Sequence, residues 1–562
     1  MNNMQISQRL KHLSEMMSLL GEHPSEIRSL EKVVLIMKTH PEEMGVLIDE
    51  DRLKNVDGID ESLAKIILHY TKSGSSTFEI KLTERLPRGL PDLLQLPGLN
   101  LKKVHLLWKQ HDIENIDQLN QACQSGQLSG MKGFGKSLEQ NLLSAIGYKR
   151  KHSKDFHLNI ALDVAQKWTL KLEALDSIGK LELSGQLRRG NELIHTIEFV
   201  VEARSSDLRA ELESTYSIEV SDATPLIITD LSGLSIMLWA CSAKEFPTCQ
   251  LIRTAGEVYL KQIDAKLAKQ GLSRSGLRIE NLLVNESSER AVCESIGIQW
   301  LEPELRDAFD QFPEDRELIE TKNVRGIFHA HSTWSDGRNT LEEMVASARA
   351  LGYEYLGMSE HSQAAYYANG LGADRVKAQW DRIDKLNEEL PGFHIFKGIE
   401  ADILKDGRLD YEEELLAGFD FVIASIHSHF HLDSKQQTDR IVRALQSPFT
   451  TMLGHPTGRM LLSREGYAPD LPGIIEVASE YGKIIEINST PKRLDLDWRY
   501  LKFAASLGVL ISINPDAHSV EGLNTIPLGV MMARKGGLTA SDVVNTMGLA
   551  EMKKFLAQRR SN

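Results

Sequence analysis

The sequence has few cysteines and no long apolar run, and each absence excludes a class of protein. Its four cysteines (Cys123, Cys241, Cys249 and Cys293) are scattered and form no CxxC pair. Neither a disulfide framework nor a zinc knuckle is therefore indicated. No stretch approaches the roughly 18 apolar residues that span a bilayer, and the first residues lack the basic start of a signal peptide. We expect a cytoplasmic protein with no membrane partner.

An excess of positive charge is also lacking. The formal net charge is −14, which argues against a protein that holds nucleic acid by a global positive field. Any nucleic-acid binding must therefore be local. The composition, with 41% hydrophobic and 26% charged residues, is that of an ordinary globular protein. At 562 residues the chain is long enough for two to four domains.

Residues 1–150 are predicted to form helices joined by short glycine turns. Three of these turns share an apolar-x-Gly-apolar-x pattern: Val56-Asp57-Gly58-Ile59-Asp60, Leu96-Pro97-Gly98-Leu99-Asn100 and Met131-Lys132-Gly133-Phe134-Gly135. This is the pattern of a helix-hairpin-helix, in which a tight turn presents backbone N–H groups to a DNA phosphate. Gly58, Gly98, Gly133, Gly135 and Lys136 are thus candidate DNA-binding residues. The alternative is that these are only turns between packed helices.

Residues 151–315 change to a mixed α/β pattern. Strand-like runs occupy residues 196–201, 225–228 and 234–238. Residues 300–325 contain Pro303, Pro313 and many charges, which predicts a linker. A further domain is then expected over residues 320–562.

Histidines and carboxylates stand at the ends of successive apolar, strand-like runs in this last region. The runs begin near residues 326, 355, 394, 421, 451, 484 and 509. The run that begins at residue 484 ends at Asn488 without an obvious ligand. The polar residues at or just beyond the ends of the other six are His329, His331, Asp336, His361, Glu400, His427, His455, Asp516 and His518. The carboxyl ends of parallel strands in a barrel converge on one mouth, so these side chains should meet in space. Mixed imidazole and carboxylate ligands suit zinc, manganese or iron. The alternative is a set of hydrogen-bonded core histidines, which fits one such residue much better than it fits the whole series.

These motifs closely resemble the polymerase-and-histidinol-phosphatase (PHP) domain, a distorted barrel of seven strands and helices. The resemblance implies three divalent metal ions: one held by His329, His331, Glu400 and Asp516; a second by Glu400 as a bridge with His427 and His455; and a third by Asp336, His361 and His518. Glu360 stands where the family usually has Asp, which leaves the metal prediction unchanged. We expect Glu400, His329, His331 and Asp516 to be catalytic.

Two metal ions about 3.5 to 4 Å apart activate water and neutralise charge on a phosphoryl group, so phosphoester hydrolysis is the expected chemistry. Arg459 and Arg493 could hold the non-reacting phosphate oxygens. As surface cations they could equally be solvated.

The order of the three domains resembles the bacterial family X DNA polymerases, whose central part is an α+β nucleotidyltransferase-like palm and thumb. Residues 184–192 are similar to the family's Gly-Ser-x-Arg-Arg turn, with Gln186 in place of Ser. The next strand of the family carries Asp-x-Asp, but this chain has Thr196 and Glu198, and Met237 stands where a third aspartate is expected. Thr and Met cannot supply the anionic oxygens that magnesium needs, so polymerase activity is expected to be weak or absent.

The leading hypothesis is a metal-dependent DNA phosphodiesterase in repair, a 3′-to-5′ exonuclease that acts on gapped, nicked or 3′-recessed duplex or on single strands. Processing of abasic sites or blocked 3′ ends is implied by the resemblance. Three alternatives remain: a gap-filling polymerase that retains Glu198, a non-catalytic DNA-binding adaptor and a small-molecule phosphatase. The sequence identifies neither the metal nor any protein partner.

Overall fold

The computed structural model describes residues 3–21, 24–39, 44–50, 52–56, 58–73, 77–94, 96–216, 218, 220–221, 225–275, 278–280, 288–308 and 316–560. Asp57 of the first glycine turn and Pro313 of the predicted linker lie outside the described residues. The chain divides into two compact units, Met1–Ser153 and Lys154–Asn562. None of the helices in the described ranges is long and apolar enough to cross a membrane.

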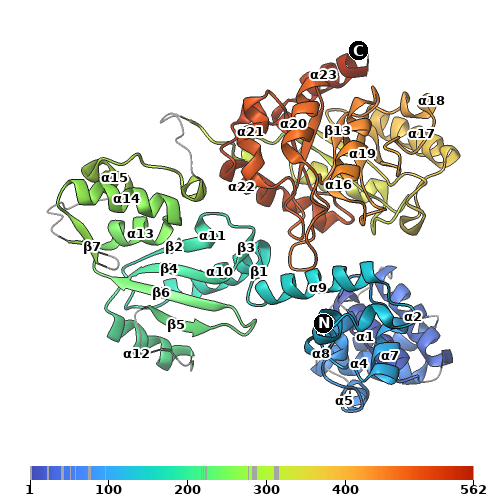
Figure 1. Cartoon of the computed structure of the whole chain (residues 1–562), viewed down its shortest axis with the longest axis horizontal. Helices are drawn as coiled ribbons and strands as arrows, with labels where there is room; N and C mark the ends of the chain where they lie inside the picture. The colour runs from blue at the N-terminus through green and yellow to red at the C-terminus, as the bar shows by residue number, and fades with distance from the viewer. Residues whose placement is uncertain are drawn as a thin grey trace. The chain divides into compact units, whose positions relative to one another are not determined.

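The first unit is helical, as the sequence predicts (Figure 1). Its helices are α1 (Asn3–Leu20), α2 (Pro24–Thr39), α3 (Met44–Asp49), α4 (Glu61–Ser73), α5 (Thr77–Thr83), α6 (Leu90–Leu94), α7 (Leu101–His111), α8 (Ile116–Gln124) and α9 (Lys136–Lys151), with 3₁₀ turns η1 (Leu53–Asn55) and η2 (Leu128–Gly130). Leu, Ile, Val and Met recur at helical spacing and form one shared core, so tertiary packing of these apolar faces stabilises the short helices.

The three glycine turns have the same geometry. The central glycines all have positive φ (Gly58 89°, Gly98 83°, Gly133 92°), a conformation that side chains disfavour. In each turn the N–H of the residue after the glycine donates to the carbonyl three residues earlier, as in Phe134 to Met131 at 3.1 Å. A helix begins two or three residues later in all three cases. The repeated pattern in the sequence therefore corresponds to a repeated backbone structure.

The first part of the second unit is a four-stranded mixed sheet with order β2-β4-β6-β5. Its strands are β2 (Lys180–Ser184), β4 (Thr196–Glu202), β5 (Leu226–Thr229) and β6 (Ser235–Cys241), and its helices are α10 (Leu158–Glu173), α11 (Gly185–Arg188), α12 (Ser205–Tyr216), α13 (Phe246–Thr254), α14 (Glu257–Lys269) and α15 (Glu289–Ile296). Short pairs β1 (Phe156–His157) with β3 (Leu193–Ile194), and β7 (Ser273–Ser275) with β8 (Arg278–Glu280), flank the sheet. β2, whose alternating side chains are partly exposed, was not predicted from the sequence.

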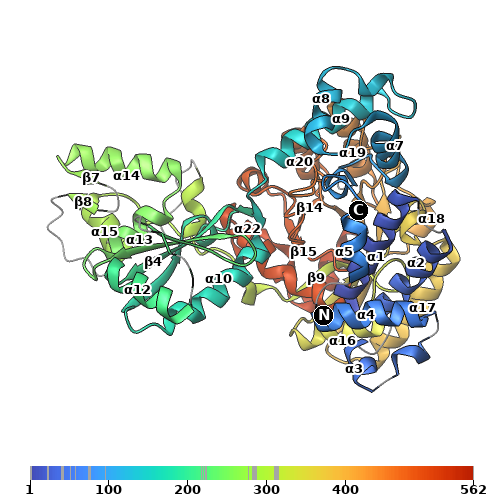
Figure 2. The same ribbon diagram turned by 90° about the horizontal axis from the view of Figure 1, so that it is seen from below.

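The second part is a nearly closed parallel barrel of seven strands with order β15-β14-β13-β12-β11-β10-β9. Figure 2 shows the first and last strands of this order, β15 and β9, near each other. The strands are β9 (Gly326–Ala330), β10 (Tyr355–Met358), β11 (His394–Asp402), β12 (Phe421–Ser425), β13 (Met452–Leu453), β14 (Ile484–Asn488) and β15 (Ile511–Asn514). Every residue of β9, β10, β12 and β14 is buried, as expected when helices cover a parallel sheet. A bridge between Ala330 and Ala517 brings the two edge strands together.

Helices and 3₁₀ turns connect the barrel strands. They are α16 (Leu341–Ala350), η5 (Tyr366–Ala368), α17 (Ala373–Glu389), α18 (Glu413–Leu416), α19 (Ser434–Gln446), α20 (Leu471–Glu480), η6 (Trp498–Tyr500), α21 (Leu501–Ser506), η7 (Val520–Thr525), α22 (Ile526–Lys535), η8 (Ala540–Asp542), η9 (Val544–Thr546) and α23 (Leu549–Arg560), preceded by η3 (Pro303–Asp307) and η4 (Thr321–Asn323).

An aromatic cluster of Phe328, Tyr355, Phe396 and Phe421 fills part of the barrel interior. Phe328 and Phe421 meet edge to face with their ring centroids 4.9 Å apart. A side chain at Gly398 would overlap the Phe421 ring, since its Cβ would lie 2.1 Å from the nearest ring atom. The barrel is thus a packed core and not a pore, so the polar residues gather at one of its ends.

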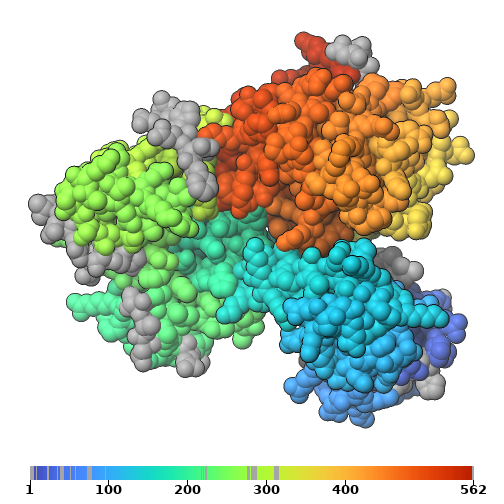
Figure 3. Space-filling view, viewed as in Figure 1, coloured from blue at the N-terminus to red at the C-terminus, as the bar shows by residue number. Residues whose placement is uncertain are grey.

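The two parts of the second unit contact each other through a buried lysine on α22. Lys535 is 1% exposed, and its ammonium group lies 2.6 Å from Asp307 Oδ2 and donates to the Arg189 carbonyl at 3.0 Å. The space-filling view shows the green and the red atoms of this unit in contact (Figure 3). A charge this deeply buried requires its partners, so these contacts fix Asp307 and Arg189 against the barrel.

Candidate metal centre

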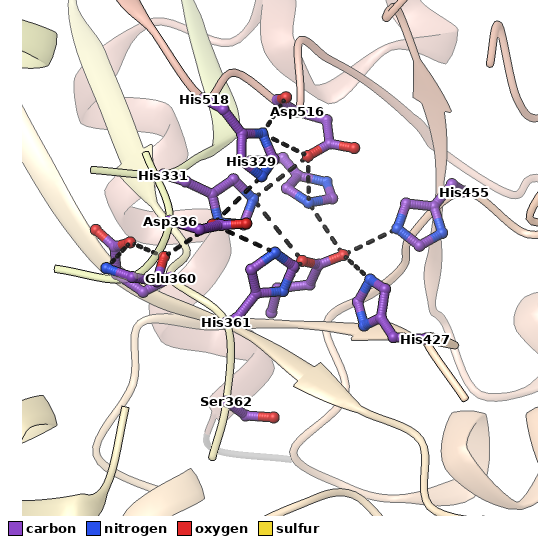
Figure 4. A network of polar contacts seen from close by, with 12 residues as sticks. His329, His331, Asp336, Glu360, His361, Ser362, His427, His455, Asp516 and His518 are labelled. Carbon is purple, nitrogen blue, oxygen red and sulfur yellow. Dashed lines mark hydrogen bonds and ion pairs between the residues drawn. The ribbon is translucent and has the colours of Figure 1, made fainter. Parts of the chain in front are cut away.

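Six histidines and three carboxylates converge at the carboxyl end of the barrel strands (Figure 4). They come from seven segments: His329 on β9, His331 and Asp336 after it, His361 after β10, Glu400 on β11, His427 after β12, His455 after β13, and Asp516 with His518 after β15. The structure therefore brings together all nine predicted ligands. Glu400 differs from expectation in one respect: it lies inside its strand, because β11 extends to Asp402.

Three of these residues have a strained backbone. His329, His455 and Asp516 have φ values of 60°, 23° and 47°, in a region that residues other than glycine seldom adopt. Each such conformation costs on the order of 1–3 kcal/mol and persists where the surrounding structure enforces it. All three residues belong to the group of converging donors.

Glu400 lies at the centre of the group. Its carboxylate is 2.9 Å from His455 Nε2, 2.9 Å from His361 Nδ1 and 3.2 Å from His427 Nε2. Glu400 is fully buried, and burial alone would raise its pKa. The surrounding imidazoles outweigh burial and hold the pKa well below its ordinary value. The carboxylate is therefore negative and available to bridge cations.

The donor atoms form four overlapping groups, each with its atoms within 4.8 Å of one another. The groups are His329, His331 and Asp516; His329, Glu400 and His455; His361, Glu400 and His427; and His331, Asp336, His361 and His518. Four residues each belong to two groups: His329, His331, His361 and Glu400. The assignment of particular ligands to three particular ions therefore remains a prediction.

The donor set fits metal ions because several of its buried atoms have no hydrogen-bond partner. Within the described part of the chain, no hydrogen bond is made by His329 Nε2, either ring nitrogen of His331, His361 Nδ1 or Glu400 Oε2, although carboxylate oxygens lie within 2.9 to 3.3 Å of three of these nitrogens. Leaving a buried polar atom unpaired costs on the order of 1–3 kcal/mol. Cations placed among these atoms would satisfy them together.

One side of the centre is open. His329 and His331 are fully buried, whereas the side chains of Asp336 and His518 are 34% and 36% exposed. The distance between His518 Nε2 and Asp336 Oδ1 is 3.4 Å. A substrate would therefore approach from the side of Asp336 and His518.

Two buried carboxylates that were not predicted as site residues orient the histidine rings. Glu486 on β14 lies 2.6 Å from His329 Nδ1, and Asp402 lies 2.5 Å from His427 Nδ1. A carboxylate on one ring nitrogen leaves the other nitrogen free to bind metal. Each residue carried a signal in the sequence: Glu486 is a lone charge inside an apolar run, and Asp402 follows Glu400 by two positions on the same strand face.

The hydrogen bonds of the Glu360 side chain go to residues other than the nine predicted ligands. Its fully buried carboxylate accepts hydrogen bonds from Ser332 Oγ at 2.5 Å and Gln379 Nε2 at 3.0 Å, and from the hydroxyl of Ser335. Burial raises its pKa. These bonds fix the segment from Ser332 to Ser335, which leads directly into Asp336.

The two predicted phosphate-binding arginines differ in their surroundings. Arg493 Nε lies 3.6 Å from Asp516 Oδ2, at the centre itself. Arg459 instead donates to the carbonyls of Arg493 and Leu494 and to Asp497 Oδ2 at 2.9 Å. Its guanidinium ties two loop segments together. The phosphate-binding prediction is consequently favoured for Arg493 and not for Arg459.

The predicted polymerase positions lie together on the four-stranded sheet. Glu198 on β4 is directly opposite Met237 on β6, and Thr196 is opposite Ser235. Glu198 accepts from Trp239 Nε1 at 2.9 Å and from Arg253 Nε at 3.0 Å. The single carboxylate is therefore neutralised by a guanidinium.

Side chains of the turn before this strand are also engaged in hydrogen bonds within the protein. Gln186 Oε1 accepts from the His195 backbone N–H at 3.0 Å, and Arg188 donates to Thr254 and Glu289. Gly185 has a φ of 65°, and a Cβ there would lie 2.5 Å from Glu198 Oε1. The turn thus packs closely against the strand that bears Glu198.

The barrel and its ring of histidines place the C-terminal region in the PHP class, and the PHP domain model matches residues 328–490. The whole chain is 32% identical over 572 residues to the DNA polymerase/3′-5′ exonuclease PolX of Bacillus subtilis (strain 168), with 99% of both chains covered. The chain belongs to this PolX family. The chain is also 28% identical over 244 residues to a probable phosphatase of Thermoanaerobacter sp. (strain X514), covering 41% of this chain and 94% of that one. A probable phosphatase of Acetivibrio thermocellus is 31% identical over 169 residues, 29% of this chain and 64% of its own.

Proposed function

We propose that the chain is a metal-dependent DNA phosphodiesterase that removes nucleotides from 3′ ends during repair. The observation that carries this proposal is the convergence of nine donors with unpartnered buried atoms at the barrel rim. Its PolX relative carries a 3′-5′ exonuclease activity in its name, which agrees with DNA as the substrate. Processing of abasic sites or blocked 3′ ends belongs to the same proposal.

Three divalent ions, manganese, zinc or iron, are the proposed cofactors, and they would supply an activated water and charge neutralisation at the phosphorus. The chain's own residues do the positioning. Glu486 and Asp402 hold the His329 and His427 rings in fixed orientations. Arg493, beside Asp516, is placed to hold a non-reacting phosphate oxygen. The partly exposed pair of Asp336 and His518 leaves the route for the 3′ end open.

We assign the remaining regions supporting roles. Residues 1–150 would be a helix-hairpin-helix domain, residues 151–315 a nucleotidyltransferase-like palm and thumb, and residues 320–562 the hydrolase. The three glycine turns would contact the DNA backbone, because each presents N–H groups where a helix begins.

Polymerisation is proposed to be weak or absent. Two magnesium ions need several anionic oxygens. Thr196 and Met237 supply none, and Glu198 is paired with Arg253. The observation that speaks for the alternative, a gap-filling polymerase, is the polymerase activity in the relative's name.

The test is hydrolysis of an end-labelled single strand and of a 3′-recessed duplex in the presence of manganese. His329→Ala and Glu400→Ala should each abolish cleavage while leaving DNA binding in place. His394→Ala is the matched control and should cleave normally. This histidine stands at the amino end of β11, away from the carboxyl ends of the strands where the nine donors gather. Parallel loss of cleavage and binding in folded variants would contradict this division of labour.

Two further alternatives are tested in the same assay. A small-molecule phosphatase, suggested by the phosphatase relatives, would turn over a phosphomonoester faster than an oligonucleotide. A non-catalytic adaptor would cleave neither with any of several divalent metals. The nine gathered ligands argue against the adaptor, because an inert barrel has no need for them.

A further inference from the structure

Two adjacent tyrosines lie exposed beside the metal centre. Tyr366 is 87% exposed and Tyr367 is 63% exposed. Both belong to η5, in the connection from β10 to α17 that also carries His361. Large aromatic side chains are usually at least half buried, and none of the interactions assigned to the metal centre uses these two.

The backbone that carries the tyrosines is fixed. Ala365 and Ala368, on either side of the pair, are 0% and 2% exposed. The Asn369 side chain donates to the carbonyls of Trp334 and Ser335 at 3.3 and 3.1 Å. The turn is therefore anchored to the segment that leads to Asp336, with its small side chains facing inward and its two rings facing solvent. A rigid aromatic surface binds with little loss of conformational entropy.

The pair adjoins the metal centre directly. The Tyr367 ring centroid is 6.4 Å from that of His361 and 6.2 Å from that of Tyr366, whose plane is turned by 77°. Partial burial, and then the carboxylates of Asp402 and Glu400, raise the pKa of the Tyr367 hydroxyl. The ring thus lies close to the donor set, on the side of His361, while its neighbour points away into solvent.

We propose that Tyr366 and Tyr367 form a stacking platform for unpaired nucleobases next to the scissile phosphodiester. This inference rests on the proposed nuclease function and narrows its substrate class to a single-stranded or frayed 3′ end. Bases in a duplex already stack on their neighbours, whereas an unpaired base can lie on a protein ring. Stacking is tolerant of sequence because every base has a π face.

The test compares two oligonucleotides that differ only in their 3′ ends. One ends in normal nucleotides, and the other ends in three abasic tetrahydrofuran nucleotides with the same phosphates. The protein variants are Tyr366→Ala/Tyr367→Ala and Tyr366→Phe/Tyr367→Phe. Tyr481→Ala is the matched control, because Tyr481 is a 41% exposed tyrosine of the same barrel that precedes β14, at the opposite end.

The unsubstituted protein should cleave the normal end with a KM about tenfold or more below that for the abasic end. The double alanine variant should lose this preference, mainly because its KM for the normal end rises. The phenylalanine variant and Tyr481→Ala should keep the preference, because stacking needs the ring and not the hydroxyl.

An unchanged preference in the double alanine variant would overturn the stacking platform. So would equal KM values for the two ends in the unsubstituted protein. Failure of the nuclease proposal has a different result, since the unsubstituted protein would then cleave neither oligonucleotide and His329→Ala would change nothing.

Discussion

Glu486 and His329 form a buried pair, with 2.6 Å between the Glu486 Oε2 and His329 Nδ1 atoms and neither side chain exposed to solvent. Burial would lower the pKa of His329, but the Glu486, Asp516 and Glu400 carboxylates raise it well above its ordinary value. The pair fixes which ring nitrogen faces Glu400. A buried strand residue thus orients a predicted metal ligand.

Replacing Glu486 by Gln should lower metal affinity about 10- to 100-fold, because the ring loses the charge that orients it and makes it basic. Titration of the metal-free protein with manganese or zinc, followed calorimetrically, measures the change. Glu289→Gln is the control, since Glu289 is a carboxylate with an 11% exposed side chain that pairs with Arg306 outside the centre. Equal affinities in the two variants would show that Glu486 does not act on the metals.

Metal binding should release protons at neutral pH. In the metal-free protein, burial would lower the pKa values of His427 and His518, but nearby carboxylates raise them to about 10 and about 9. Both rings are then protonated at pH 7, and each must lose its proton to become a ligand. Affinity should therefore increase as the pH rises toward 9.

Calorimetric titration in two buffers of different ionisation enthalpy counts the protons released. The count of released protons should fall between pH 7 and pH 10, because the metal-free protein loses these protons by itself as the pH rises.

The same two pKa shifts also affect the stability of the folded, metal-free protein. Both pKa values are raised above the unfolded value, so the stability that they contribute to the metal-free protein is present below about pH 6.5 and is lost as the pH rises through 9 and 10. A proton count that does not depend on pH would contradict both statements.

Primer extension with magnesium and deoxynucleotides should give little or no incorporation. The physical reason is the loss of anionic ligands at Thr196 and Met237, together with the pairing of Glu198 with Arg253. Glu198→Ala should leave 3′-end hydrolysis unchanged, because Glu198 lies on the four-stranded sheet and not in the barrel. Template-directed incorporation that Glu198→Ala abolishes would instead establish a working polymerase.

The nine donors could be found from the sequence because each stands at or near the end of an apolar run, and parallel strands of a barrel bring their ends together. The register of Met237 against Glu198 also agrees with the alignment to the polymerase motif. Both predictions used only short sequence motifs and the rule that the carboxyl ends of neighbouring parallel strands lie together.

The roles of Glu486 and Arg459 could not be predicted in the same way. Glu486 lies inside an apolar strand, and only the barrel geometry shows that it faces His329. Arg459 follows His455 closely in sequence, which made a phosphate ligand plausible. Its actual partners are the carbonyls of Arg493 and Leu494, which a distant loop brings close. Contacts between segments far apart in sequence decide both cases.

The glycine turns of the first unit offer a matched pair of substitutions. Gly133 has a φ of 92° and Gly126 a φ of 71°, and a Cβ at either position would meet no atom within 4 Å. Alanine should therefore cost similar stability at both, on the order of 1–2 kcal/mol, through backbone strain alone. Only Gly133 belongs to a turn that leads into a helix start at Lys136.

Gly133→Ala should weaken binding to a 3′-recessed duplex at low salt, because the added methyl group lies where a DNA phosphate would approach the backbone. Gly126→Ala should bind as the unsubstituted protein does. Fluorescence anisotropy measures the binding, and thermal denaturation shows whether the two variants are equally destabilised. Both substitutions place alanine at a positive φ without a steric clash. If the two variants are equally stable, a difference in their DNA affinity reports the close approach of DNA to the Gly133 turn. Equal binding at equal stability would mean that this turn only connects packed helices.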